Sequence, residues 1–218
     1  MLKLVIGNKA YSSWSLRPWI LLRQADIPFE EVLIPLYEPG STDAILRYAP
    51  TGKVPCLIDG SITVWESLAI CEYIAEQHPD KTLWPRDKAV RAEARALAAE
   101  MHSGFSALRQ HFPMNVRRTL KHRAHPSEVG RDLARFSAMV ESMRARFAGA
   151  GPFLAGEFSI ADAMFAPVAT RCRTYALRLP SRAQAWVDHL LGLPAMQEWY
   201  AAAAAEPWIL AGSEPEGE

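Results

Sequence analysis

The sequence predicts a mixed α/β domain in the N-terminal third of the chain, followed by a domain made only of helices. Three observations support this prediction. Residues 1–80 alternate short apolar runs with helical patterns in the order βαβαββα. The pair Asp59-Gly60 separates the last two apolar runs, and Asp-Gly favours a tight hairpin turn. From about Lys88 onward the chain is alanine-rich and follows a helical pattern.

The order of the N-terminal elements joins a parallel βαβ unit to an antiparallel hairpin, which is the thioredoxin-like pattern. The expected strands cover residues 2–6, 29–36, 56–58 and 62–64, and the expected helices cover residues 16–26 and 42–48 and begin again at 66–67. Ser15 is expected to cap the first helix, and Pro18 falls in its first turn, where its missing N–H is harmless.

The C-terminal part is expected to contain helices at residues 88–111, 126–148, 160–173, 182–191 and 195–205. Ser159 and Asp162 have the spacing of a capping box at the start of the third of these helices. We therefore expect one domain over residues 1–82 and an all-helical domain over residues 88–218. Residues 212–218 are acidic, and we expect them to fray.

Composition excludes several classes of protein. Among the 218 residues, half are hydrophobic and the formal net charge is zero, so neither nucleic acid nor a membrane surface is an expected partner. The three cysteines have neither metal-site spacing nor a disulfide pattern, which predicts no metal and favours a reducing, cytoplasmic setting. No apolar run is long enough to span a bilayer.

The stretch from Thr51 to Ile70 carries the strongest functional signal. The backbone of Val54, at the mouth of a strand, can pair with an extended peptide. The helix start at Glu66-Ser67 offers free N–H groups to a carboxylate, and the Glu66 side chain can bind an ammonium group. A peptide with a free carboxylate and a free amine, such as glutathione, fits these features. The alternative is an ordinary hairpin followed by a capped helix.

Three separated motifs resemble the cytosolic glutathione transferase family. They are Ser12-Ser13-Trp14-Ser15-Leu16-Arg17, Gly52-Lys53-Val54-Pro55 and Glu66-Ser67-Leu68-Ala69-Ile70. The first loop is most similar to the serine-type, zeta-like branch. The resemblance implies a thioredoxin-like domain plus an all-α domain, a homodimer, and glutathione as co-substrate. It also implies that Lys53, Val54, a cis Pro55, Glu66 and Ser67 bind the tripeptide.

The chemistry implied by the resemblance is the ionisation of the glutathione thiol. A free thiol has a pKa near 8.5, and a donated hydroxyl hydrogen bond or a helix N-terminus favours the anion. In zeta-like members the first serine of the Ser-Ser pair has this role, which points to Ser12; delta- and theta-like members place it at the position of Ser13. Zeta-like members usually carry a cysteine where this chain has Trp14. Trp14 is expected to narrow or roof the site.

The predicted function is attack of the glutathione thiolate on a small electrophile. The alternatives are a cis–trans isomerase of the maleylacetoacetate type and a binding protein without turnover. Arg17 is expected to be a structural ion-pair partner. An apolar stripe after Lys88 either lines the second-substrate pocket or belongs to the core, and such stripes more often belong to the core. The stripe consists of Met101, Phe105, Leu108, Phe112 and Met114.

Overall fold

A four-stranded mixed sheet forms the N-terminal part of the protein in the computed structural model, which describes residues 1–122 and 124–215. The strand order is β2-β1-β3-β4, with β1 parallel to β2 and antiparallel to β3. The strands are β1 (Leu2–Ile6), β2 (Phe29–Leu33), β3 (Cys56–Asp59) and β4 (Ile62–Trp65). The Asp59-Gly60 turn joins β3 to β4, with Gly60 at a φ of 59°. This topology confirms the thioredoxin-like prediction.

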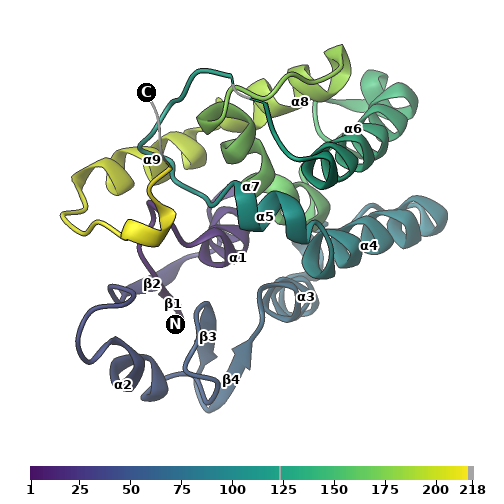
Figure 1. Cartoon of the computed structure of the whole chain (residues 1–218). Coiled ribbons are helices and arrows are strands. Elements are labelled where there is room, and N and C mark those ends of the chain that lie inside the picture. The colour runs from purple at the N-terminus through teal and green to yellow at the C-terminus, as the bar shows by residue number, and fades with distance from the viewer. Residues whose placement is uncertain (123, 216–218) are drawn as a thin grey trace.

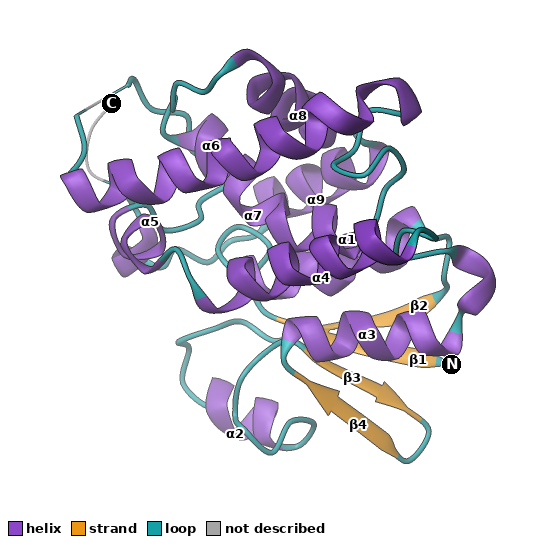
Figure 2. Ribbon diagram, turned by 90° about the vertical axis from the view of Figure 1, so that its right-hand side faces the viewer, coloured by secondary structure: helices purple, strands orange, loops and turns teal. Residues whose placement is uncertain are grey.

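Alternating residues of the sheet face two different layers of helices. Leu4, Ile6 and Leu57 belong to the main core, with α1 (Ser13–Gln24) and α3 (Ser67–Gln77). Val5 and Cys56 pack on the opposite face, in the small cluster beneath α2 (Ser41–Leu46). This is the period-two alternation that a strand with both faces covered requires. Figure 2 shows α2 on one side of the orange strands and the other helices on the other side.

The described residues from Lys88 onward form helices joined by loops, with no strand among the named elements, as predicted. The helices are α4 (Lys88–Ser103), α5 (Ser106–His111), α6 (Ser127–Phe147), α7 (Ile160–Thr174), α8 (Ser181–Leu191) and α9 (Pro194–Ala205). Short 3₁₀ turns lie at Pro79–Lys81, Ala148–Ala150 and Ala211–Ser213. Buried along almost its whole length, α7 lies at the centre of the molecule and packs against α1, α4 and α8 (Figure 1). The described helices include none that is both long and apolar enough to cross a membrane.

The predicted capping box at the start of α7 is confirmed. Asp162 is fully buried and accepts hydrogen bonds from the Ser159 N–H at 3.0 Å and the Ser159 hydroxyl at 3.1 Å. It also accepts from the N–H of Leu154 and from the indole N–H of Trp186, each at 2.9 Å. One carboxylate therefore ties the start of α7 to the preceding loop and to α8.

The prediction of one helix over residues 88–111 is wrong. The helix stops at Ser103, and α5 starts three residues later, because the intervening backbone is not helical. Gly104 has extended φ and ψ angles of −98° and −164°, and Phe105 lies in the left-handed region with a φ of 61°. A Cβ at Gly104 would approach the Glu100 carbonyl oxygen to 2.9 Å, so this break favours glycine.

The second strand is also shorter than predicted. It ends at Leu33, although the Ile34 N–H still donates to the Ile6 carbonyl at 2.9 Å. Pro35 follows and has no N–H with which to extend the ladder. The chain then turns toward α2 and the cleft described below.

Candidate active site

The loop before β3 leaves a backbone edge open, as the sequence predicts. Pro55 follows a cis peptide bond and is buried, whereas Lys53 is exposed. The backbone N–H and C=O of Val54 form no hydrogen bond with other described residues. A peptide backbone placed along this edge can therefore pair with both groups.

The start of α3 places a carboxylate and a hydroxyl side by side. Glu66 has a positive φ of 69°, and its side chain is 58% exposed. Ser67 is buried and accepts a long hydrogen bond of 3.4 Å from the Arg17 guanidinium. His102 is an ionisable neighbour of Glu66, with 3.7 Å between Glu66 Oε2 and His102 Nε2. Burial and the charge of Arg17 lower the pKa of His102, which favours neutral imidazole at neutral pH and leaves the Glu66 charge available for a ligand cation.

The serines after β1 are arranged differently from the prediction. The first helix begins at Ser13, so Ser12 and not Ser15 occupies the N-cap position. Ser15 lies fully buried in the first helical turn, where its oxygen accepts the Gly7 N–H at 3.1 Å. The hydroxyl oxygens of Ser12 and Ser15 are 2.7 Å apart. The helix starts earlier than predicted because the Asn8 carbonyl already accepts a hydrogen bond from the Ser12 N–H, at 2.8 Å.

All but one of the predicted site residues line two adjoining hollows of the protein surface. A cavity of about 550 Å³ is lined by Ser12, Ser13, Trp14, Lys53 and Val54, among others. A smaller one of about 180 Å³ is lined by Trp14, Thr51, Lys53, Val54, Pro55 and Glu66. Because Trp14, Lys53 and Val54 border both, the hollows form one cleft between α1 and the loop before β3. Ser67 is the one predicted site residue that lines neither hollow; it lies buried next to Glu66.

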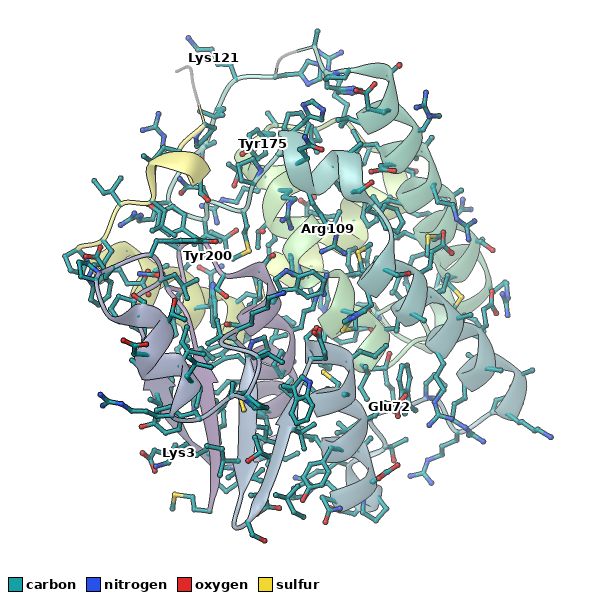
Figure 3. All side chains as sticks on the ribbon, turned by 60° about the horizontal axis from the view of Figure 1, so that its bottom comes forward. Lys3, Glu72, Arg109, Lys121, Tyr175 and Tyr200 are labelled. Atoms are coloured by element: carbon teal, nitrogen blue, oxygen red, sulfur yellow. The ribbon has the colours of Figure 1, made fainter. Side chains whose placement is uncertain are left out.

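Trp14 walls the cleft and is backed by positive charge. The guanidinium carbon of Arg17 lies 4.1 Å from the indole centroid and that of Arg109 lies 4.8 Å away, both within cation–π range. The ion pair expected for Arg17 is absent among the described residues. The Arg17 side chain is fully buried, and no carboxylate of those residues bonds to its guanidinium. Burial and the charges of Arg109 and Arg171 hold its pKa well below the usual range. Figure 3 shows Arg109 in the middle of the molecule, in contrast to Lys121 at its edge.

The C-terminal segment forms a further wall of the cleft, which the sequence did not predict. Leu210 and Ser213 line the larger cavity together with Tyr11. The Tyr11 hydroxyl donates to Glu214 at 2.6 Å, and the Asn115 side chain donates to the same carboxylate at 3.0 Å. The expected fraying is therefore wrong for residues 212–214, while residues 216–218 lie outside the described part of the chain.

A second contact ties this segment to the loop that carries the serines. The Glu206 carboxylate accepts the N–H of Lys9 at 2.6 Å and that of Ala10 at 3.0 Å. Arg117 donates to the carbonyls of Glu206 and Trp208 at 2.9 and 2.7 Å. Figure 1 shows the yellow C-terminal segment beside the purple N-terminal chain. Such contacts join residues about 200 positions apart in the sequence, so no local sequence pattern predicts them.

The remaining candidate residues belong to the protein core. The apolar stripe from Met101 to Met114 is buried and lines neither hollow. All three cysteines are buried free thiols, and burial raises the pKa of Cys56 to about 11 and that of Cys172 to about 12. Among the described residues, no group of three or more His, Cys, Asp or Glu side chains is placed to hold a metal ion.

Comparison with known proteins shows which family this chain resembles. Residues 11–77 match the glutathione S-transferase N-terminal domain, and residues 123–202 match the C-terminal domain of the same family. A probable maleylacetoacetate isomerase from Caenorhabditis elegans is 34% identical over 96 residues, 44% of each chain. Glutathione S-transferase GstB from Escherichia coli is 27% identical over 184 residues, which cover 82% of this chain and 88% of GstB.

The fold comparison agrees with the sequence comparison. A glutathione transferase homologue from Burkholderia, solved with bound glutathione, superimposes with a TM-score of 0.69 at 21% identity. The superposition covers 94% of this chain and 99% of that one. Both halves of the chain thus match in sequence and in fold, and the protein belongs to the glutathione S-transferase family.

Proposed function

We propose that this protein is a glutathione transferase that ionises the glutathione thiol and directs it at a small electrophile. The observation that carries the proposal is the cleft itself. It brings the Ser12 hydroxyl, the N-terminus of α1, the open Val54 backbone and the exposed Glu66 carboxylate to one place. These groups come from three separated segments of the sequence. An ordinary hairpin and capped helix would not require them to meet.

Each end of glutathione has a matching group in the cleft. The Val54 N–H and C=O pair with the peptide backbone of the tripeptide, and the exposed Lys53 ammonium is available to its glycine carboxylate. At the other end, Glu66 binds the ammonium group, while Ser67 and the free N–H groups of α3 bind the neighbouring carboxylate. Pro55 forms part of the wall between them.

The reaction needs the thiol as its anion. The Ser12 hydroxyl donates a hydrogen bond to the sulfur, the N-terminus of α1 adds its positive dipole, and Ser13 is the second candidate donor. The thiol proton is lost to solvent. The thiolate sulfur then forms a bond to an electrophilic carbon, and the leaving group departs with the bonding electron pair. We assign residues 1–82 to glutathione binding and residues 88–218 to the helical domain that completes the second-substrate site. Conjugation of this kind serves detoxification.

A glutathione-dependent cis–trans isomerase is the second candidate function. The similarity to a probable maleylacetoacetate isomerase over 96 residues favours it. Trp14 argues against it, because that loop position usually carries cysteine in zeta-like proteins. A panel of electrophiles that includes maleylacetone separates the two enzymes by which substrate turns over.

Titration calorimetry with glutathione tests the proposal first. We expect saturable binding, and we expect Glu66→Ala or Ser67→Ala to weaken it by about 1.5–3 kcal/mol, because each removes a hydrogen bond to a charged ligand group. Glu76→Ala is the matched control, since Glu76 is an exposed glutamate further along α3. Affinity unchanged in both site variants would place the pocket elsewhere. No binding at millimolar glutathione would favour a protein that does not use this co-substrate.

We also propose a homodimer in a reducing, cytoplasmic setting. The dimer is supported by β4, an edge strand that exposes Ile62 at 48% and Trp65 at 43%. The setting is supported by three free cysteines. Light scattering at micromolar concentration should give twice the mass of one chain, and the mass of a single chain would contradict the dimer.

A further inference from the structure

Ser15 lies behind Ser12 in a fully buried position. Its oxygen accepts the Gly7 N–H at 3.1 Å and lies 2.7 Å from the Ser12 oxygen. Ser12, in turn, borders the larger cavity. The Gly7 N–H, the Ser15 hydroxyl and the Ser12 hydroxyl therefore form a chain of hydrogen bonds that leads from the end of β1 to the cleft.

The burial of Ser15 determines which way the hydrogen bonds run. A serine hydroxyl has one proton to donate. If Ser12 donated to Ser15, the Ser15 proton would lack an acceptor, because the described residues offer its hydroxyl no partner other than Gly7 and Ser12. A buried unsatisfied donor is costly, so the favoured direction is from Ser15 to Ser12. The Ser12 proton is then free to point into the cavity.

The backbone of Ser12 is held independently of Ser15. Its N–H donates to the Asn8 carbonyl at 2.8 Å, and its carbonyl accepts the Leu16 N–H at 3.2 Å. Loss of the Ser15 hydroxyl would therefore leave Ser12 in place but release the rotation of its hydroxyl. A hydroxyl that already accepts a hydrogen bond is also the stronger donor, because bonds in a chain polarise one another.

We propose that Ser15 is a positioning residue that fixes the Ser12 hydroxyl as a donor to the glutathione sulfur. The inference rests on the proposed function, in which Ser12 stabilises the thiolate. A purely structural role for Ser15, as the acceptor that satisfies Gly7, is the rival explanation. The two explanations differ in what happens to the thiol when Ser15 changes in a protein that remains folded.

The test is the pH titration of thiolate absorbance in glutathione-saturated protein. We expect Ser15→Ala to raise the thiol pKa by about 0.5 to 1 unit, a roughly three- to tenfold fall in the acid dissociation constant of the thiol. In the double variant Ser12→Ala/Ser15→Ala, the pKa should equal that of Ser12→Ala alone, because Ser15 acts through Ser12. Ser15→Cys keeps the side chain's approximate size with only a weak donor, so it serves if Ser15→Ala does not fold.

The matched control is Ser159→Ala, which removes another buried serine hydroxyl from a helix N-terminus, that of α7. It should lower the melting temperature and leave the thiol pKa unchanged. A shift in Ser12→Ala with none in the folded Ser15 variants would overturn the positioning role while leaving the proposed function intact. An unshifted Ser12→Ala titration would overturn serine activation itself, and this inference with it.

Discussion

Replacing Ser12 with alanine is expected to raise the pKa of glutathione bound in the cleft by about one to two units. The change removes a hydrogen bond to a charged sulfur, worth about 1.5–3 kcal/mol, and one pKa unit corresponds to about 1.4 kcal/mol. Turnover at neutral pH should fall as the thiolate fraction falls, by at most about 10- to 100-fold. Glutathione affinity should change little, because Lys53, Val54, Glu66 and Ser67 are untouched.

The pH profile of turnover checks this expectation. Raising the pH should partly restore the activity of Ser12→Ala, because solvent then removes the thiol proton. Ser13→Ala should have the smaller effect. A shifted profile in Ser13→Ala with a normal one in Ser12→Ala would transfer the role to Ser13. Normal profiles in both would leave backbone N–H groups and the α1 dipole as the activators.

Replacing Asp162 with alanine is expected to lower the free energy of unfolding by about 3–5 kcal/mol. The carboxylate is fully buried and accepts four hydrogen bonds, from Leu154, from Trp186 and twice from Ser159. Its burial raises the pKa of Asp162 while these hydrogen bonds oppose the shift. Removal leaves four donors without an acceptor, beside a void between α7 and α8.

Denaturant unfolding of Asp162→Ala beside Asp188→Ala measures this effect. Asp188 is exposed on α8, and among the described residues its carboxylate accepts only from the Gln184 side chain, at 2.8 Å. Its loss should change stability by no more than about 0.5 kcal/mol. Similar stabilities for the two variants would show that the capping box is not what anchors α7.

Most of the fold was predictable because the local signals agree. Apolar periodicity, the Asp59-Gly60 turn and the Ser159/Asp162 spacing each point to the element that forms. The break after Ser103 was not predictable in this way, since Gly104 is tolerated within a helical pattern and Phe105 gives no sign of its left-handed backbone. The start of α1 was misplaced because Ser12 and Ser15 are equally good cap residues by type. The hydrogen bond from Ser12 to Asn8 decides between them.

The parts of the candidate site that lie within single loops were predictable from the sequence. The parts that depend on the fold bringing distant residues together were not. Lys53, Val54, Pro55 and Glu66 were expected to lie close together, and the structure places them around one hollow. The stacking of Arg17 and Arg109 against Trp14, and the tail contacts of Glu206, depend on tertiary packing. Arg17, which was expected in an ion pair, is an example. The residue type reveals that its side chain is charged, but it does not reveal which residues pack around it.

The most direct measurement of the central claim is the titration of glutathione thiolate absorbance in complex with the unmodified protein. The cleft offers a hydroxyl donor, a helix N-terminus and the guanidinium groups of Arg17 and Arg109 behind Trp14, and each favours the anion. The thiol should therefore ionise clearly below the value of about 8.5 typical of a free thiol, with most of it anionic at neutral pH. A bound thiol that titrates at or above the value for free glutathione would contradict the claim that this cleft activates glutathione.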